Sequence, residues 1–200
     1  MSSEIKIGVI DYGGGNIRSL VQALEKLGTS PELVTSPEKL DSLSHLFFPG
    51  QGAFGDCMAK LQGLQLVEPI FDWIHQDKPF FGICVGYQLL FEGSDESPGT
   101  RGLSILEGNV VRFREEGIKV PHMGWNNLRF KKSHPLFANI HANDHFYFVH
   151  SYEFKAFTEK EVIATTDHAK EIVAAIAKDN MVGLQFHPEK SQIQGLKIIK

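Results

Sequence analysis

Cysteine is scarce in this chain: Cys57 and Cys84 are the only two among 200 residues. So few cysteines exclude the disulfide framework of small secreted domains and are typical of a reducing compartment. The first residues lack the basic start and apolar run of a signal peptide, and no uninterrupted apolar run approaches the ~20 residues that span a bilayer. We therefore expect a cytoplasmic protein without a membrane segment.

Positive charge is also in short supply. The 20 lysines and arginines are outnumbered by 24 aspartates and glutamates, which leaves a formal net charge of −4. This balance excludes a nucleic-acid or anionic-membrane binder that works through bulk charge. The hydrophobic share of 42% is ordinary for a folded protein, and a chain of this length buries a sizeable core. We therefore expect residues 1–200 to form one domain.

The first half of the chain alternates strand-like and helix-like patterns. Short apolar runs predict strands at 5–10, 32–35, 45–48 and 79–84. Apolar residues at helical spacing predict helices at 17–27 and 64–75, and a further helix that starts at Tyr87. Strands that alternate with helices indicate right-handed βαβ units on a parallel sheet.

The second half of the chain has a different pattern, in which strands dominate. Further strands are predicted at 109–113, 146–150, 162–166, 172–177 and 181–185. The connections between them hold few helical patterns, so hairpins and antiparallel pairing are expected. Residues 93–108 and 126–145 show no clear periodicity. The sequence therefore predicts an α/β fold, with a mixed but mostly parallel central sheet and added antiparallel strands in the second half.

The strongest local signal for chemistry is the pentapeptide Gly82-Ile83-Cys84-Val85-Gly86. It follows an apolar strand and precedes a helix, which is the layout of a nucleophile elbow with cysteine as the nucleophile. The sulfur would then lie at the carboxyl end of the sheet, where a helix N-terminus favours the thiolate. The Val85 N–H is placed to help hold an oxyanion. A buried cysteine in an ordinary strand-to-helix turn is the alternative interpretation.

A thiolate nucleophile needs a base, and His187-Pro188-Glu189 is the best candidate among nine histidines. It follows the predicted strand 181–185, so it also belongs at an end of the sheet. Pro188 disfavours a helical start at His187, and in an extended chain His187 and Glu189 point the same way. The carboxylate would then orient the imidazole. A surface histidine without a catalytic role is the alternative.

Taken with their flanking residues, these motifs make the chain resemble the class I glutamine amidotransferases, and more narrowly the glutaminase subunits of imidazole glycerol phosphate synthases. The resemblance covers nearly the whole chain. It is carried by IDYGGGNIRSL (10–20), FPGQGAFGDCM (48–58), GICVGYQLLFEGS (82–94), KVPHMGWN (119–126), FYFVHSY (146–152) and QFHPEKS (185–191). It implies the class I glutamine amidotransferase fold, with a flavodoxin-like sheet flanked by helices.

The resemblance also implies a reaction, which is hydrolysis of L-glutamine to L-glutamate and ammonia through a thioester on the catalytic cysteine. The implied catalytic triad is Cys84, His187 and Glu189. Main-chain groups that would hold the oxyanion are those of Gln51, Gly52 and Val85. Side chains or backbone that would contact the substrate belong to Gln88, Glu96, Ser151 and Tyr152. Glycines on both sides of Gln51 suggest that this peptide reorients easily, so we hypothesise that it acts as a switch.

Free ammonia is largely protonated in neutral water, so it has to be delivered along a protected path. The resemblance implies a heterodimer with a (β/α)₈ synthase subunit, which makes imidazole glycerol phosphate and AICAR in histidine biosynthesis. The residues that would face this partner are Trp125, Tyr147 and Lys190. No cofactor, nucleic acid or membrane is expected as a ligand.

Two other features suggest ligands but lack the spacing that such ligands require. The run Gly13-Gly14-Gly15 has neither the dinucleotide fingerprint nor the ending of a phosphate loop, so a tight turn is expected. His141, His145 and His150 do not match a closed zinc site, and we expect no metal.

Other functions stay open at the level of sequence. The same triad would serve a paralogous glutaminase that supplies ammonia for amination of a surface-polysaccharide sugar. A non-enzymatic regulator or scaffold on this fold is a different class, and the intact Cys84, His187 and Glu189 argue against it. A cysteine hydrolase with another substrate would leave Gln88 and the FYFVHSY segment unexplained.

Overall fold

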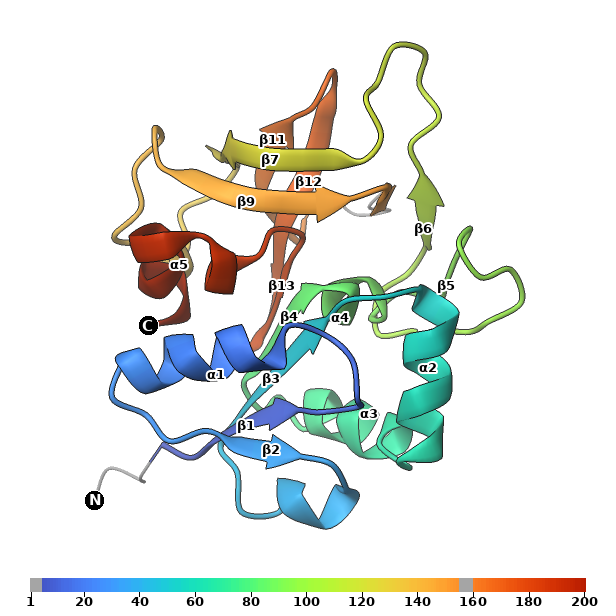
Figure 1. The fold of residues 1–200 in the computed structure, drawn as a ribbon, viewed down its shortest axis with the longest axis vertical. Helices are drawn as coiled ribbons and strands as arrows, with labels where there is room; N and C mark the ends of the chain where they lie inside the picture. Colours follow the sequence, from blue (N-terminus) through green and yellow to red (C-terminus); the bar gives the residue numbers. More distant parts are fainter. Residues whose placement is uncertain (1–4, 155–159) are drawn as a thin grey trace.

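The computed structural model describes residues 5–154 and 160–200, and a large twisted sheet dominates it (Figure 1). The sheet has eight strands in the order β2-β1-β3-β4-β13-β12-β11-β8. From β2 to β13 the neighbours pair in parallel, and β12, β11 and β8 continue the sheet antiparallel. In sheet order the strands are Glu32–Val34, Ile7–Ile10, His45–Gly50, Phe80–Cys84, Met181–Leu184, Glu171–Lys178, Val162–Asp167 and Arg129–Phe130.

Helices connect the parallel strands and cover both faces of the sheet. The α-helices are α1 Ile17–Lys26, α2 Phe54–Gly63, α3 Val67–His75, α4 Val85–Gln88 and α5 Gln192–Ile199, and short 3₁₀ turns span Pro37–Leu40, Pro135–Phe137 and Pro188–Lys190. The chain steps from β1 to β2 in one direction along the sheet and from β3 to β4 in the other. Right-handed crossovers therefore place α1 and α3 on opposite faces, and α5 lies beside α1 (Figure 1).

The parallel strands are apolar throughout because both faces of the sheet are covered. All four residues of β1 are buried, and α1 contributes Leu20, Ala23 and Leu24 at helical spacing. A second hydrophobic cluster lies around β9 and β13 and contains Phe146, Phe148 and Phe186. The two clusters fix the positions of the strands whose ends form the site.

Two smaller sheets lie beside the main one. Strands β10, β6 and β5 form a three-stranded sheet, and β7 pairs with β9 antiparallel. Their bounds are Tyr152–Phe154, Asn109–Arg112, Gly93–Ser94, His122–Asn127 and His145–His150. The β7–β9 ribbon passes over the carboxyl end of β13 (Figure 1), and His187 forms a bridge with Tyr147 of β9. No helix in the described ranges is long and apolar enough to cross a bilayer.

The predicted fold class is confirmed, and several element boundaries need correction. The sequence pattern does not predict helix α2, and the helix expected from Leu64 begins at Val67. Helix α4 begins at Val85, earlier than the expected Tyr87. The sequence pattern does not predict strand β7 or the short strands β5, β8 and β10.

Candidate active site

The carboxyl ends of β3, β4 and β13 meet at one edge of the sheet. Gly50 of β3 pairs with Cys84 of β4, and Leu184 of β13 pairs with Ile83. Ligand sites in open α/β sheets lie at this edge, beside the point where the strand order reverses. The cysteine motif at 82–86 and the histidine motif at 187–189 therefore come together at this edge of the sheet.

Cys84 lies at the strand-to-helix turn in a strained conformation, with φ 51° and ψ −109°. Non-glycine residues with positive φ are uncommon and cluster at functional sites. The flanking glycines provide space. A Cβ on Gly86 would lie 2.0 Å from the Phe48 carbonyl oxygen, and one on Gly82 would crowd the Gly86 backbone at 3.1 Å. The sequence thus allows β3 to approach the turn closely and leaves the sulfur at the N-terminus of α4.

His187 and Glu189 form the pair that the sequence predicts, by a different backbone path. His187 is extended, but Pro188–Lys190 is a 3₁₀ turn, so the segment does not continue as the extended chain that was expected. The His187 Nδ1 nonetheless lies 2.8 Å from Glu189 Oε1, and both side chains are buried. Asn16 also donates to the same carboxylate oxygen, at 3.4 Å. The contact with Glu189 therefore uses the Nδ1 of the imidazole and leaves the Nε2 as the ring nitrogen for other contacts.

The electrostatics of His187 favour the imidazolium. Burial alone would lower its pKa, but the charge of Cys84 and the contact with Glu189 outweigh it and raise the pKa to about 10. Within the described residues, the buried Nε2 has no conventional hydrogen-bond partner. A protonated histidine beside the cysteine is the state in which a thiolate is stabilised.

Gln51 and Gly52 follow the end of β3 and line a cavity together with Cys84 and His187. Gly52 has φ +115°, a conformation that favours glycine. The Gln51 N–H donates to the Tyr12 hydroxyl at 3.3 Å, and the Cys57 thiol lies 3.8 Å from the Gln51 carbonyl oxygen. Burial raises the pKa of Cys57, so this second thiol is favoured in its neutral form. The N–H predicted to hold an oxyanion is thus bonded to Tyr12 in this structure.

A cavity of about 330 Å³ opens beside Cys84 and His187. The residues predicted from the resemblance to bind the oxyanion or the substrate all line it, namely Gln51, Gly52, Val85, Gln88, Glu96, Ser151 and Tyr152. Glu96 accepts a hydrogen bond from the Phe54 N–H at 2.8 Å, which anchors its carboxylate at the start of α2. The cavity places polar groups from four separate chain segments around one thiol.

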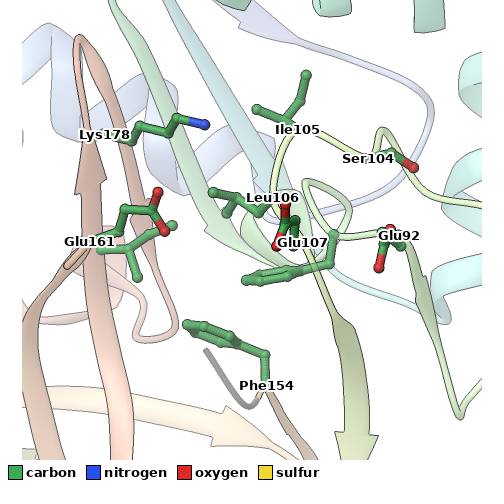
Figure 2. Close-up of a pocket in the computed structure, with 10 residues that line it drawn as sticks. Glu92, Ser104, Ile105, Leu106, Glu107, Phe154, Glu161 and Lys178 are labelled. Atoms are coloured by element: carbon green, nitrogen blue, oxygen red, sulfur yellow. The ribbon is translucent and has the colours of Figure 1, made fainter. Parts of the chain in front are cut away.

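A separate cavity of about 300 Å³ lies between β12 and the segment after α4 (Figure 2). Figure 2 shows Lys178 and Glu161 on one side, with Glu92 and Glu107 across from them. Neither cysteine nor histidine is among the described residues that line it. Because the lining of this cavity holds no cysteine–histidine pair, the cavity beside Cys84 is the better candidate for an active site.

Comparison with known proteins agrees with this geometry. Residues 8–199 match the family model described as "Glutamine amidotransferase class-I". The imidazole glycerol phosphate synthase subunit HisH of Geobacter sulfurreducens is 45% identical, over 98% of this chain and 96% of the relative. HisH of Aquifex aeolicus is 46% identical, over 96% and 93%. This chain belongs to the class I glutamine amidotransferases, in the HisH family.

Solved structures support the fold of this HisH family member. The structure of PurLQS from Thermotoga maritima matches with a TM-score of 0.76 at 21% identity, and covers 98% of this chain and 96% of that one. A crystal structure of a glutamine amidotransferase matches with a TM-score of 0.75 at 22% identity, over 95% and 94%. At these identities the likeness shows a shared fold.

The three residues predicted to face a partner lie together on the β7–β9 ribbon and the adjoining turn. Trp125 and Tyr147 are register partners with ring centroids 5.9 Å apart, and Lys190 Nζ lies 6.0 Å from the centre of the Tyr147 ring. Trp125 is 49% exposed and neighbouring Met123 is 61% exposed. The main chain of Tyr147 also accepts a hydrogen bond from the His187 N–H at 2.9 Å. Strand β9, which contributes Tyr147 to this aromatic face, is therefore hydrogen-bonded to the main chain of the predicted base, His187.

The sequence reasoning missed four residues of this site. Tyr12 and Asn16 flank the glycine run, and they bond to Gln51 and Glu189. Gln185 donates to the Cys84 sulfur, and His150 lines the cavity while its Nδ1 lies 2.7 Å from the Tyr152 carbonyl oxygen. Tyr12, Asn16, Gln185 and His150 all stand within the quoted motifs, which was the available signal.

Proposed function

We propose that this chain is the glutaminase of an imidazole glycerol phosphate synthase, which hydrolyses L-glutamine to L-glutamate and ammonia. The observation that carries the proposal is the convergence of Cys84, His187 and Glu189 at one sheet edge, beside a cavity lined with polar groups. The names and near-complete coverage of the HisH relatives support the assignment to this synthase.

The reaction begins with attack of the Cys84 thiolate on the carboxamide carbon of glutamine. His187 either takes the thiol proton as the reaction starts or already carries it in an ion pair, which its raised pKa favours. When the tetrahedral intermediate collapses, His187 gives its proton to the leaving nitrogen, so ammonia departs and a thioester remains. Water, activated by His187, then hydrolyses the thioester to glutamate. Glu189 keeps the imidazole oriented throughout.

The oxyanion of the tetrahedral intermediate is held by main-chain N–H groups of Gln51, Gly52 and Val85. Val85 is the first residue of α4, where N–H groups and the helix dipole favour negative charge. The Gln51 N–H becomes available when its peptide turns away from the Tyr12 hydroxyl. One such donor contributes about 10²–10³ in rate. Holding this peptide in the wrong orientation therefore keeps the enzyme slow until a partner engages.

Four residues hold the substrate in the cavity. Gln88 contacts the side-chain amide, whereas Ser151 and Tyr152 hold the amino-acid end, partly through their backbone. Glu96 lies on the cavity wall with its carboxylate anchored by the Phe54 N–H, and is placed to attract the α-ammonium group. Each proposed role matches a group that lines the cavity.

Ammonia leaves for a (β/α)₈ synthase subunit that forms imidazole glycerol phosphate and AICAR. Exposed Trp125 and half-buried Tyr147, with Lys190, form the proposed docking face. An apolar face rimmed by a charged side chain is typical of a protein interface. The main-chain carbonyl of Tyr147 accepts a hydrogen bond from the His187 N–H, so a subunit that docks on Tyr147 lies close to the proposed catalytic base.

The proposal is tested by a glutamate-release assay on the chain alone, with the (β/α)₈ subunit of an imidazole glycerol phosphate synthase, and with that subunit plus its nucleotide ligand. We expect little or no release from the chain alone and strong stimulation in the complex. Equal rates in all three samples would remove the switch at Gln51. If no glutamate were released under any condition, the glutaminase assignment would be wrong. If only a sugar-aminating synthase stimulated the release, the chain would belong to a different pathway.

A further inference from the structure

Gln185 is a buried amide that contacts Cys84 and Gln88, two residues that line the proposed substrate cavity. It follows β13, in a segment where side chains alternate between the two faces. Phe186 therefore points into the second hydrophobic cluster, while Gln185 and His187 point toward Cys84. Only 1% of Gln185 is exposed. The motif that supplies the base thus delivers a second polar group to the same place.

Both ends of this amide are used. The Gln185 Nε2 donates to the Cys84 sulfur at 3.7 Å, and its Oε1 accepts from Gln88 Nε2 at 3.0 Å. Burial of an amide is costly unless its polar atoms are hydrogen-bonded. A methionine would fill a similar space without that cost. The structure instead joins the nucleophile to Gln88 through one rigid planar group.

We propose that Gln185 is a positioning residue for the proposed glutaminase reaction: its N–H supports the Cys84 thiolate, and its carbonyl oxygen orients Gln88 to select a carboxamide. A hydrogen bond to the charged form of a group favours that form, so the donated N–H favours sulfur as an anion. The inference deepens the proposed function and rests on it for the identity of the substrate.

The selection of a carboxamide over a carboxylate follows from the orientation of the Gln88 side chain. With its Nε2 directed at Gln185, the Gln88 Oε1 is the end available to accept a hydrogen bond from the substrate. A glutamine carboxamide offers an N–H there, whereas the carboxylate of glutamate offers only oxygen. A site built to bond an N–H rejects the analogue that lacks it. Gln185 thereby acts on specificity without touching the substrate.

The thiolate role is tested on the unliganded chain by alkylation with iodoacetamide across pH, with peptide mass mapping to separate Cys84 from Cys57. Gln185→Met removes the donor, and Gln185→Asn shortens the amide by one methylene. Either substitution is expected to move the alkylation midpoint of Cys84 up by about one pH unit. Near neutral pH this shift corresponds to an alkylation rate about tenfold lower. The matched control is Thr166→Val, which removes a hydrogen bond from another fully buried residue of the same sheet.

The outcomes are distinct. The control is expected to keep the midpoint of the unaltered chain. A midpoint at or below that value in a folded Gln185→Met or Gln185→Asn chain overturns the thiolate role. Circular dichroism decides which variants are folded, and the asparagine variant keeps the test available if the methionine variant is not.

The specificity role is tested in the complex with the synthase subunit. The measured quantity is the KM for glutamine divided by the inhibition constant for glutamate. Both Gln185 variants are expected to raise this ratio about tenfold, because Gln88 is free to present its N–H to a carboxylate. An unchanged ratio overturns the specificity role. If the unaltered complex released no glutamate, the proposed function would fail, while the alkylation result on Cys84 would still stand by itself.

Discussion

The main-chain N–H of Gln51, a residue that lines the cavity beside Cys84, donates to the hydroxyl of Tyr12 across 3.3 Å. The same hydroxyl lies 3.6 Å from the Cys57 sulfur. Tyr12 is 3% exposed, and burial is the main cause that raises its pKa far above the ordinary value, so it stays a neutral hydroxyl. A single side chain therefore holds the peptide that the proposed mechanism needs to turn.

Tyr12→Phe is expected to raise the glutaminase rate of the chain without its partner by about fivefold. The reason is that one neutral hydrogen bond contributes about 1 kcal/mol to holding the peptide in its inactive orientation. Glutamate release by the chain alone measures this effect, and the rate in the full complex should change little. Tyr87→Phe is the control, because its buried hydroxyl has no hydrogen-bond partner within the described ranges. A Tyr12→Phe rate at or below the original would contradict the holding role.

The two cysteines are expected to differ sharply under substitution. Cys84→Ala removes the nucleophile and should lower glutamate release in the complex by about 10⁴-fold or more. Cys57→Ala removes a buried thiol next to Gln51 and should cost stability while the rate in the complex stays within about fivefold. Steady-state kinetics and urea unfolding measure the two effects. Substantial activity in Cys84→Ala would end the thioester mechanism.

Glu189→Gln is expected to lower kcat by at least about 10²-fold with a small change in KM. An amide keeps the shape of the carboxylate but removes the charge that supports the imidazolium at 2.8 Å. Asn16→Ala should have a smaller effect in the same direction, since its 3.4 Å contact only steadies that carboxylate. Steady-state kinetics of both variants and of the unaltered chain, each in the complex, measure which substitution lowers kcat more. If Asn16→Ala proved more damaging than Glu189→Gln, the assigned hierarchy would be wrong.

The sequence predicts the nucleophile and its base because each lies in a short motif with a local physical reason. The glycines around Cys84 give the chain room to turn, and Pro188 stops a helix at His187. The proposed support of Gln185 and Asn16 is not visible in this way. The contact between Gln88 and Gln185 joins residues 97 positions apart, and that between Asn16 and Glu189 spans 173. Only the folded sheet brings these groups together.

Helix α2 shows a different reason for failure. Its buried residues Phe54, Cys57, Met58 and Leu61 have helical spacing. Glycine is a poor helix former, and Gly52 and Gly55 lie at the start of this run, so the helical pattern does not stand out in the sequence. A Cβ on Gly55 would lie 2.8 Å from the Ser97 hydroxyl oxygen, and glycine leaves room for that oxygen to accept a hydrogen bond from the Gly55 N–H at 2.9 Å. Gly55 thus packs closely against Ser97, a contact that only the folded chain shows.

The raised pKa of His187 makes stability depend on pH on the alkaline side. Burial opposes the charged form, but Cys84 and Glu189 outweigh it and raise the pKa from 6.5 to about 10. The stabilising contribution is therefore complete below pH 6.5 and is lost as pH rises through about 10. We expect the unfolding free energy lost in His187→Gln to be larger at pH 6 than at pH 10, as measured by urea unfolding. A difference that stays constant or grows with pH would contradict this electrostatic account.

His150 gives the opposite dependence on the acid side. It is buried and lies 3.0 Å from His122, and burial is the main cause that lowers their pKa values from 6.5 to about 3 and about 4. Because the unfolded chain binds these protons more readily, stability is full above pH 6.5 and falls as pH drops toward those values. For His150 alone the loss at pH 5 is about 2 kcal/mol.

The check is urea unfolding at pH 7 and pH 5 for the unaltered chain and His150→Gln. The glutamine keeps polar atoms in the site but does not titrate, so we expect a clearly smaller loss between the two pH values. His45→Gln is the matched control, because this histidine is partly exposed and hydrogen-bonded to Ser44 at the amino end of β3, away from the cavity. If His150→Gln lost as much stability between pH 7 and pH 5 as the unaltered chain, the acid sensitivity would have to arise from other groups.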